Sequence, residues 1–129
     1  MTRHQTFGQR LRELRKDKNL SQRELAERVS ARLRAEDRRG FDFTYLSKIE
    51  NDRSPPPSIP AIVQLAHELG ADPNELITLA GKPPPQMEKA LMESEGARTF
   101  FRSAFSQHLT NAVWKKLAED LERRKKKAP

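Results

Sequence analysis

The sequence predicts an all-α protein, built from one small helical domain followed by a helical extension. Apolar residues recur at three- and four-residue spacings along most of the chain, no segment alternates as a strand does, and capping residues, glycines and prolines separate the segments. At 129 residues the chain is long enough for such a domain and an appendage. Hydrophobic residues make up 35% and charged residues 33%, which favours a thin core between amphipathic helices.

The first two helices are expected near the N-terminus. One covers residues 6–18, and Asn19 ends it. Ser21 opens the second with a capping box, because Glu24 lies three residues on and can reach back to the amide of the cap residue. The apolar residues that mark their buried faces are Phe7, Leu11, Leu14, Leu25 and Val29.

Residues 30–39 allow two interpretations. Leu33 continues the spacing of the second helix, and the composition favours helix, so that helix can extend by two turns. The same residues, rich in arginine, can instead form a basic loop.

A third and a fourth helix follow. Gly40 breaks the helical pattern, and Asp42 is a good N-cap for a helix over residues 43–51. A proline triplet then forms a stiff turn before a helix over residues 58–69, which Gly70 ends. The residues expected to face inward are Leu46, Ile49, Ile62, Leu65, Ala66 and Leu69.

The fifth helix begins with Asp72 as its cap and Pro73 at its first position, and Glu75 is expected to complete a capping box. A second proline triplet then divides the chain into a domain over residues 6–82 and a segment over residues 84–129.

That segment is expected to contain helices over residues 86–93, 97–105 and 110–126. Its large apolar groups are too many for short isolated helices to bury, so they pack on the first domain or form an interface. The residues expected in a dimer or partner interface are Phe100, Phe101, Phe105, Trp114 and Leu117.

The charge distribution points to a polyanion partner. The net charge is +7, and residues 1–54 hold 14 Lys and Arg against 9 Asp and Glu. Residues 110–129 hold 7 against 3, whereas the middle of the chain is mildly acidic. Two basic segments, one near each terminus, favour nucleic acid as the partner. No cysteine, signal peptide or membrane-spanning run is present, so we expect a cytoplasmic protein without a membrane partner.

Catalytic and metal sites are not expected. The three histidines, His4, His67 and His108, lack metal-ligand spacing, and no glycine-rich phosphate loop occurs. We therefore expect no enzyme activity, no cofactor and no metal.

Three stretches carry a family resemblance: "LSQRELAERV" (20–29), "GFDFTYLSKIENDRSPPPS" (40–58) and "LAHELGADPNEL" (65–76). In this order they resemble the Cro and phage-repressor-like helix-turn-helix family, also called the xenobiotic-response-element family, over about residues 6–81. The resemblance implies a five-helix lambda-repressor-like DNA-binding domain. This sequence departs from the family where residues 30–39 stand in place of a short turn between the second and third helices.

The resemblance implies that the third helix enters the major groove of double-stranded DNA. Lys48 could then donate to guanine O6 and N7, and Thr44 could bond a base edge or touch a thymine methyl. An apolar ring at Phe43 suits a thymine methyl or a sugar, although it could instead staple the helix start, as we expect of Phe41. The base-reading set is Phe43, Thr44, Ser47 and Lys48.

The resemblance also implies phosphate contacts for Gln22, Asn51, Arg53 and Ser54. The set is completed by the hydroxyl of Tyr45 and by the charges of Arg38 and Arg39, which lie in the segment that departs from the family. Gln22 stands at the start of the second helix, whose free amides favour an anion. Tyr45 is also expected to pack at the edge of the domain. The arginines of residues 30–39 either extend the positively charged surface that faces the DNA or project away from the duplex.

Arg15 and Glu50 match a family ion pair between the first helix and the end of the third. Such a pair would hold the reading helix against its scaffold, so we expect its role to be structural.

The function expected from these features is a dimeric transcriptional repressor that reads a palindromic operator with residues 43–51. The alternative is an antitoxin-like or protease-switched interaction module, whose C-terminal helices bind a partner protein such as a toxin or a metallopeptidase. Nonspecific binding of nucleic acid by charge alone is a third possibility.

Overall fold

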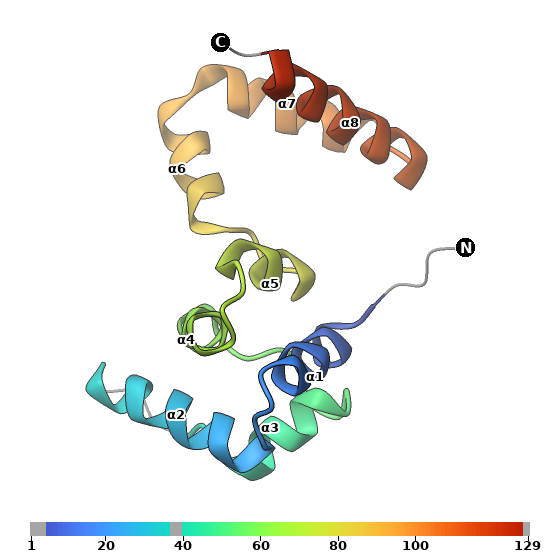
Figure 1. Ribbon diagram of the computed structural model, residues 1–129. Helices are drawn as coiled ribbons and strands as arrows, with labels where there is room; N and C mark the ends of the chain where they lie inside the picture. The colour runs from blue at the N-terminus through green and yellow to red at the C-terminus, as the bar shows by residue number, and fades with distance from the viewer. Residues whose placement is uncertain (1–4, 37–39, 128–129) are drawn as a thin grey trace. The chain divides into compact units, whose positions relative to one another are not determined.

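The computed structural model describes residues 5–36 and 40–127, and all regular structure in these ranges is helical, which confirms the all-α prediction (Figure 1). The chain divides into two compact units, Met1–Pro84 and Pro85–Pro129. The helices of the first unit are α1 (Phe7–Asp17), α2 (Gln22–Ala35), α3 (Phe43–Glu50), α4 (Ile59–Leu69) and α5 (Pro73–Leu79). Those of the second unit are α6 (Pro85–Glu93), α7 (Glu95–Ser106) and α8 (Asn111–Lys127).

The α2 helix continues to Ala35, so the helical interpretation of residues 30–39 holds for the part that the structure describes. Leu33 extends the apolar stripe of the helix and is buried, which stabilises the added turn against the core. Arg38 and Arg39 lie outside the described residues.

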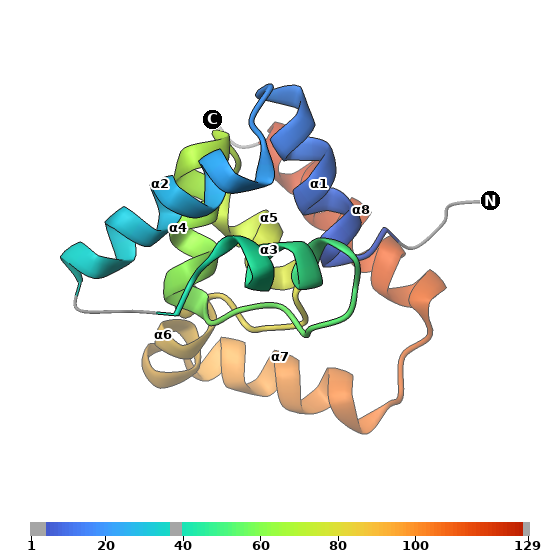
Figure 2. The same ribbon diagram turned by 90° about the horizontal axis from the view of Figure 1, so that it is seen from below.

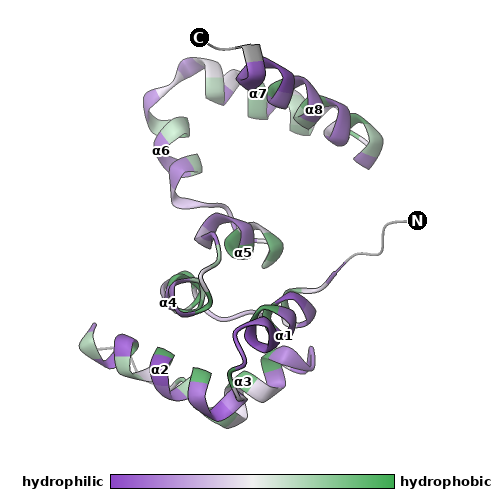
Figure 3. Cartoon of the chain, in the orientation of Figure 1, coloured by the Kyte–Doolittle hydropathy of each residue, from purple (hydrophilic) through white to green (hydrophobic). Residues whose placement is uncertain are grey.

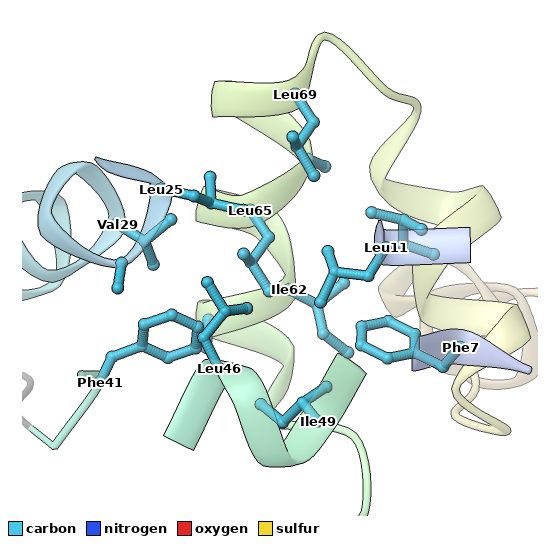
Figure 4. Packing of buried hydrophobic residues seen from close by; sticks show 14 of the residues in the cluster. Phe7, Leu11, Leu25, Val29, Phe41, Leu46, Ile49, Ile62, Leu65 and Leu69 are labelled. Atoms are coloured by element: carbon cyan, nitrogen blue, oxygen red, sulfur yellow. The ribbon is translucent and has the colours of Figure 1, made fainter. Parts of the chain in front are cut away.

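The core of the first unit surrounds α4, which packs against α2 and α5, while α3 packs against α1 and α2. Figure 4 shows Ile62 and Leu65 of α4 in the middle of the cluster, with Phe7 and Phe41 at opposite ends. Each large side chain buried in this way contributes about 1.5–3 kcal/mol. The expected inward-facing residues are buried in the structure, except Leu14, which is half-buried.

Two helix starts in this unit carry complete capping boxes. At α2 the Ser21 hydroxyl accepts the Glu24 amide and the Glu24 carboxylate accepts the Ser21 amide, as predicted. The bond from the Ser21 amide holds the pKa of Glu24 below its usual range. At α1 the same arrangement joins Thr6 and Gln9, which the sequence analysis did not identify.

The capping box predicted for α5 is wrong. Asp72 caps the helix by accepting the Asn74 amide, but Glu75 does not reach back to it. Its carboxylate instead accepts a hydrogen bond of 2.8 Å from Arg10 of α1. A cationic donor is a stronger partner than a neutral amide, and it joins α5 to α1.

Gly8 lies where α1 meets the end of α3. A Cβ at this position would stand 2.3 Å from the Ile49 carbonyl oxygen, 2.6 Å from a carboxylate oxygen of Asp52 and 3.0 Å from the Glu50 carbonyl oxygen. Two of these atoms belong to the backbone, so a side chain can be accepted only if α3 moves away from α1.

Gly8→Ala is therefore expected to destabilise the first unit by about 1–3 kcal/mol, although alanine has the higher helix propensity. Urea unfolding measures this change. Gly96→Ala in α7 is the matched control, because its Cβ would meet only the Ser94 hydroxyl at 3.7 Å. Equal stability of Gly8→Ala and the wild type would contradict the close approach of the two helices.

Candidate nucleic-acid interface

The start of α3 is set by three consecutive residues. Gly40 adopts a φ of 92°, which a residue with a side chain rarely does. Phe41 follows and is buried beside Leu46, as expected of a hydrophobic staple (Figure 4). Asp42 then caps the helix by accepting the Tyr45 amide at 2.8 Å. The first turn of α3 therefore has a fixed position on the core.

The outward face of α3 carries the predicted base-reading residues. Leu46, Ile49 and Glu50 point inward. Thr44 and Lys48 are exposed four residues apart, and Phe43 is 37% exposed. Ser47 lies half-buried on the same helix. The side chains of Thr44 and Lys48 have no hydrogen bond or ion pair with other described residues, so both are free to meet a ligand.

A buried ion pair holds α3 against α1. Arg15 donates to Glu50 through Nε at 2.7 Å and through Nη2 at 2.9 Å, and its Nη1 donates to the Leu20 carbonyl at 2.8 Å. Arg15 is 9% exposed and Glu50 is 4% exposed. The two parallel bonds fix both the distance and the orientation of the helices.

Gln22 takes part in this network. Its side-chain amide nitrogen donates to Glu50 at 3.0 Å, so one of its two N–H groups is used inside the protein. The sequence predicts that this amide bonds a phosphate oxygen. Only the second N–H group remains for that contact.

The segment after α3 folds back onto the end of the helix. The side-chain amide of Asn51 donates to the Ser47 carbonyl at 2.9 Å, and the backbone amide of Arg53 donates to the Lys48 carbonyl at 2.8 Å. Ser54 is half-buried, and its amide also points to the Lys48 carbonyl. The Arg53 side chain is exposed and has no partner within the described ranges.

Tyr45 lies half-buried at the edge of the unit. Its ring meets the Phe41 ring edge-on, with 5.5 Å between the centroids. The structure thus accounts for the ring of Tyr45 by packing, as the sequence analysis also expected.

Arginines of the extended α2 are used in different ways. Arg32 forms an ion pair of 2.5 Å with Glu68 of α4, and Arg28 approaches the same carboxylate at 3.9 Å. Arg34 donates to the Ser30 hydroxyl one turn earlier. Arg32 therefore joins α2 to α4, and its charge is not free to contact a phosphate.

Arg23 was missed by the sequence analysis. Its guanidinium carbon stands 4.6 Å from the centroid of the Phe43 ring, a cation–π contact of about 0.5–1 kcal/mol at an exposed site. Twenty residues separate the two in the sequence, and no local pattern predicts that they meet. Arg23 stands in the first turn of α2 and Phe43 at the start of α3, the two helices that Figure 2 shows on the near side of the first unit.

The second unit exposes much of its apolar surface. The exposed fractions are 45% for Phe100, 60% for Phe105 and 36% for Trp114, and Ala104 is buried. The aromatic rings form a chain along α7 to α8, with centroid distances of 5.2, 6.0 and 6.4 Å. Figure 3 shows that both helices carry hydrophobic and hydrophilic residues on different sides.

An apolar groove runs between α7 and α8, with a volume of about 500 Å³. Its lining residues are Ala97, Phe100, Phe101, Leu117, Asp120, Leu121 and Arg124. Leu117, predicted to lie in an interface, is half-buried in this groove.

Residues 5–36 and 40–127 contain neither a candidate metal site nor a candidate membrane span. No group of three or more His, Asp or Glu side chains there is arranged to hold a metal ion. None of the helices in those ranges combines the length and the apolar character that crossing a bilayer requires.

Comparison with known families gives a match over residues 8–82 to the family described as "Helix-turn-helix domain". Among the curated proteins no significant match was found. Among the solved structures, a chain of the "SinR protein/SinI protein complex" is similar, with 23% sequence identity and a TM-score of 0.48. That alignment covers 94% of this chain and 99% of the other.

Proposed function

The chain belongs to the helix-turn-helix domain family and is a DNA-binding regulator, and from this premise we propose that it is a dimeric cytoplasmic repressor that reads a palindromic operator with α3. The observation that carries the proposal is the outward face of α3. Thr44 and Lys48 project from a helix whose other side is fixed by a buried ion pair. A rigid reading helix holds its side chains in register with the base pairs.

Base reading is assigned to four side chains of α3. Lys48 donates to guanine O6 and N7, and Thr44 bonds a base edge or touches a thymine methyl. Phe43 and Ser47 complete the contact at the start and in the middle of the helix. These assignments are supported by the exposure of Thr44, Lys48 and Phe43 on one helix.

Phosphate binding is assigned to the residues around this helix. The N-terminus of α2 presents free amides, and the second N–H group of Gln22 lies beside them. Arg53 adds an exposed charge after α3. Further contacts are proposed for the hydroxyls of Tyr45 and Ser54, for Asn51, and, from the sequence alone, for Arg38 and Arg39.

Dimerisation is assigned to the second unit. Its groove is apolar and open, and a small unit with this much exposed aromatic surface gains by covering it. In a two-fold interface each patch meets its own copy. Asp120, which pairs with Arg123 of the same helix, and Arg124 line the groove and would supply its charged contacts.

Selection of bound duplexes from random sequence tests the function. We expect inverted repeats with half-sites about one helical turn, roughly 34 Å, apart. The protein should sediment at twice its mass of 14.9 kDa. The selected duplex should keep a preference over random DNA of at least about a thousandfold as salt is raised. Equal affinity for all duplexes would refute specific reading.

The groove also supports the second candidate, a protein-interaction module. A chain that sediments as a monomer and binds an asymmetric site would leave the α7–α8 surface for a different protein, of the toxin or metallopeptidase class expected from the sequence.

A further inference from the structure

Arg23 and Phe43 join the starts of two helices that are proposed to meet DNA. Arg23 is the second residue of α2 and Phe43 is the first residue of α3. The guanidinium lies over the ring at 4.6 Å, and both residues line a surface hollow of about 250 Å³. The ring therefore presents one face to the arginine while 37% of the residue remains exposed.

The Arg23 guanidinium has no ion-pair partner among the described residues, although it stands at the start of a helix. Helix N-termini carry a partial positive charge, which disfavours a cation in the first turn. Apart from its contact with Phe43, the Arg23 side chain has no ion pair or hydrogen bond with any residue in the ranges 5–36 and 40–127. Glu27 and Asp42 line the same hollow, but neither lies within salt-bridge distance of it.

The contact with Phe43 leaves the guanidinium available to a ligand. None of its five N–H donors is hydrogen-bonded to another described residue, and a guanidinium that stacks on a ring keeps these donors free because they lie in its plane. Planar forked donors suit the oxygens of a phosphate. The ring thus restricts a flexible side chain without using its hydrogen-bonding capacity.

Resting on the proposed function, we propose that Arg23 and Phe43 act as one unit, in which the Phe43 ring holds the Arg23 guanidinium against a backbone phosphate at the edge of the groove that α3 enters. Arg23 is then a sequence-independent anchor that sets the depth of α3. Phe43 contributes to affinity for every duplex, in addition to any contact with a base.

A double-mutant cycle tests this unit, with affinity measured on a random and on a selected duplex across salt concentrations. Arg23→Ala should lower affinity roughly tenfold for each half-site on both duplexes, the effect of one charge-assisted bond. It should also reduce the salt slope by about one for each half-site. Arg28→Ala is the matched control, because it removes the same charge from the same helix on the side facing Glu68.

The coupling between the two residues is the decisive quantity. In a Phe43→Leu background, the loss caused by Arg23→Ala should shrink roughly two- to fivefold. Arg23→Lys should keep the salt slope but lose most of this coupling, because a lysine lacks the planar group. In the free protein, ring-current shifts of the Arg23 side-chain protons should disappear in Phe43→Leu.

Additive losses in the cycle, an unchanged salt slope in Arg23→Ala, or unshifted Arg23 protons in the wild type would each overturn the proposal. Failure of the proposed function gives a different result. If the wild-type protein binds all duplexes equally, base reading is refuted. The salt slope and the double-mutant cycle, both measured on random DNA, still decide whether Arg23 contacts a phosphate.

Discussion

Replacing Glu50 by alanine is expected to destabilise the first unit by about 3–5 kcal/mol, the cost of leaving one partner of a buried ion pair unpaired. Arg15 would keep its bond to the Leu20 carbonyl but lose two bonds to the carboxylate. Gln22 would lose its acceptor as well. Because small domains are stable by about 5–15 kcal/mol, this single change would remove a large part of the total.

Thermal or urea unfolding measures the loss, and two variants separate its causes. Glu50→Gln keeps the shape of the side chain but not its charge, so its free energy of unfolding should lie between those of the wild type and Glu50→Ala. A double variant, Arg15→Leu with Glu50→Leu, should be more stable than Glu50→Ala, because it leaves no unpaired buried charge. Unchanged melting of Glu50→Ala together with lost DNA binding would contradict the structural role.

Lys48→Ala is expected to have the largest effect on recognition. The side chain is exposed on α3 and free of partners among the described residues, so its removal should leave the melting temperature within a few degrees of the wild type. If Lys48 reads a guanine, the preference for the selected duplex should fall by about 1–3 kcal/mol, roughly five- to 150-fold. Competition binding against random DNA measures this preference.

Arg53→Ala is the matched comparison, because it removes the same charge from the segment just after α3. We expect it to weaken binding to all duplexes alike and to reduce the salt slope by about one for each half-site. Equal losses for Lys48→Ala and Arg53→Ala on every sequence would show that Lys48 contacts only phosphate.

The helices and their buried faces were predictable because they depend on local rules. The spacing of Leu25 and Val29 located the core face of α2, and Leu33 indicated that the helix continues. The Ser21 capping box and the stop at Gly70, whose φ is 64°, also appear in the structure. Each of these features depends on residues within a few positions of one another.

Side-chain partners between helices were mostly not predictable. Glu75 was assigned to its own helix start, and only the docking of α5 on α1 shows that Arg10 is its partner. The pairing of Arg32 with Glu68 and the stack of Arg23 on Phe43 likewise depend on how helices cross.

The Arg15–Glu50 pair was foreseen, but only through family resemblance. The bond from Gln22 to Glu50 was not foreseen, since a polar residue in a first helical turn is commonly solvated. The aromatic residues of α7 and α8 are exposed, which agrees with the expectation that short helices cannot bury all the large apolar groups of this segment. The sequence does not say what covers them.

A loss-of-contact experiment tests base reading by α3 most directly. Guanines of the selected half-site are replaced one at a time by 7-deazaguanine, which lacks the N7 acceptor, and affinity is measured for the wild type and for Lys48→Ala. We predict one position where the replacement weakens the wild type but leaves Lys48→Ala unchanged. If every replacement affects both proteins equally, Lys48 does not meet a guanine N7, and its assignment as a base-reading residue of α3 is contradicted.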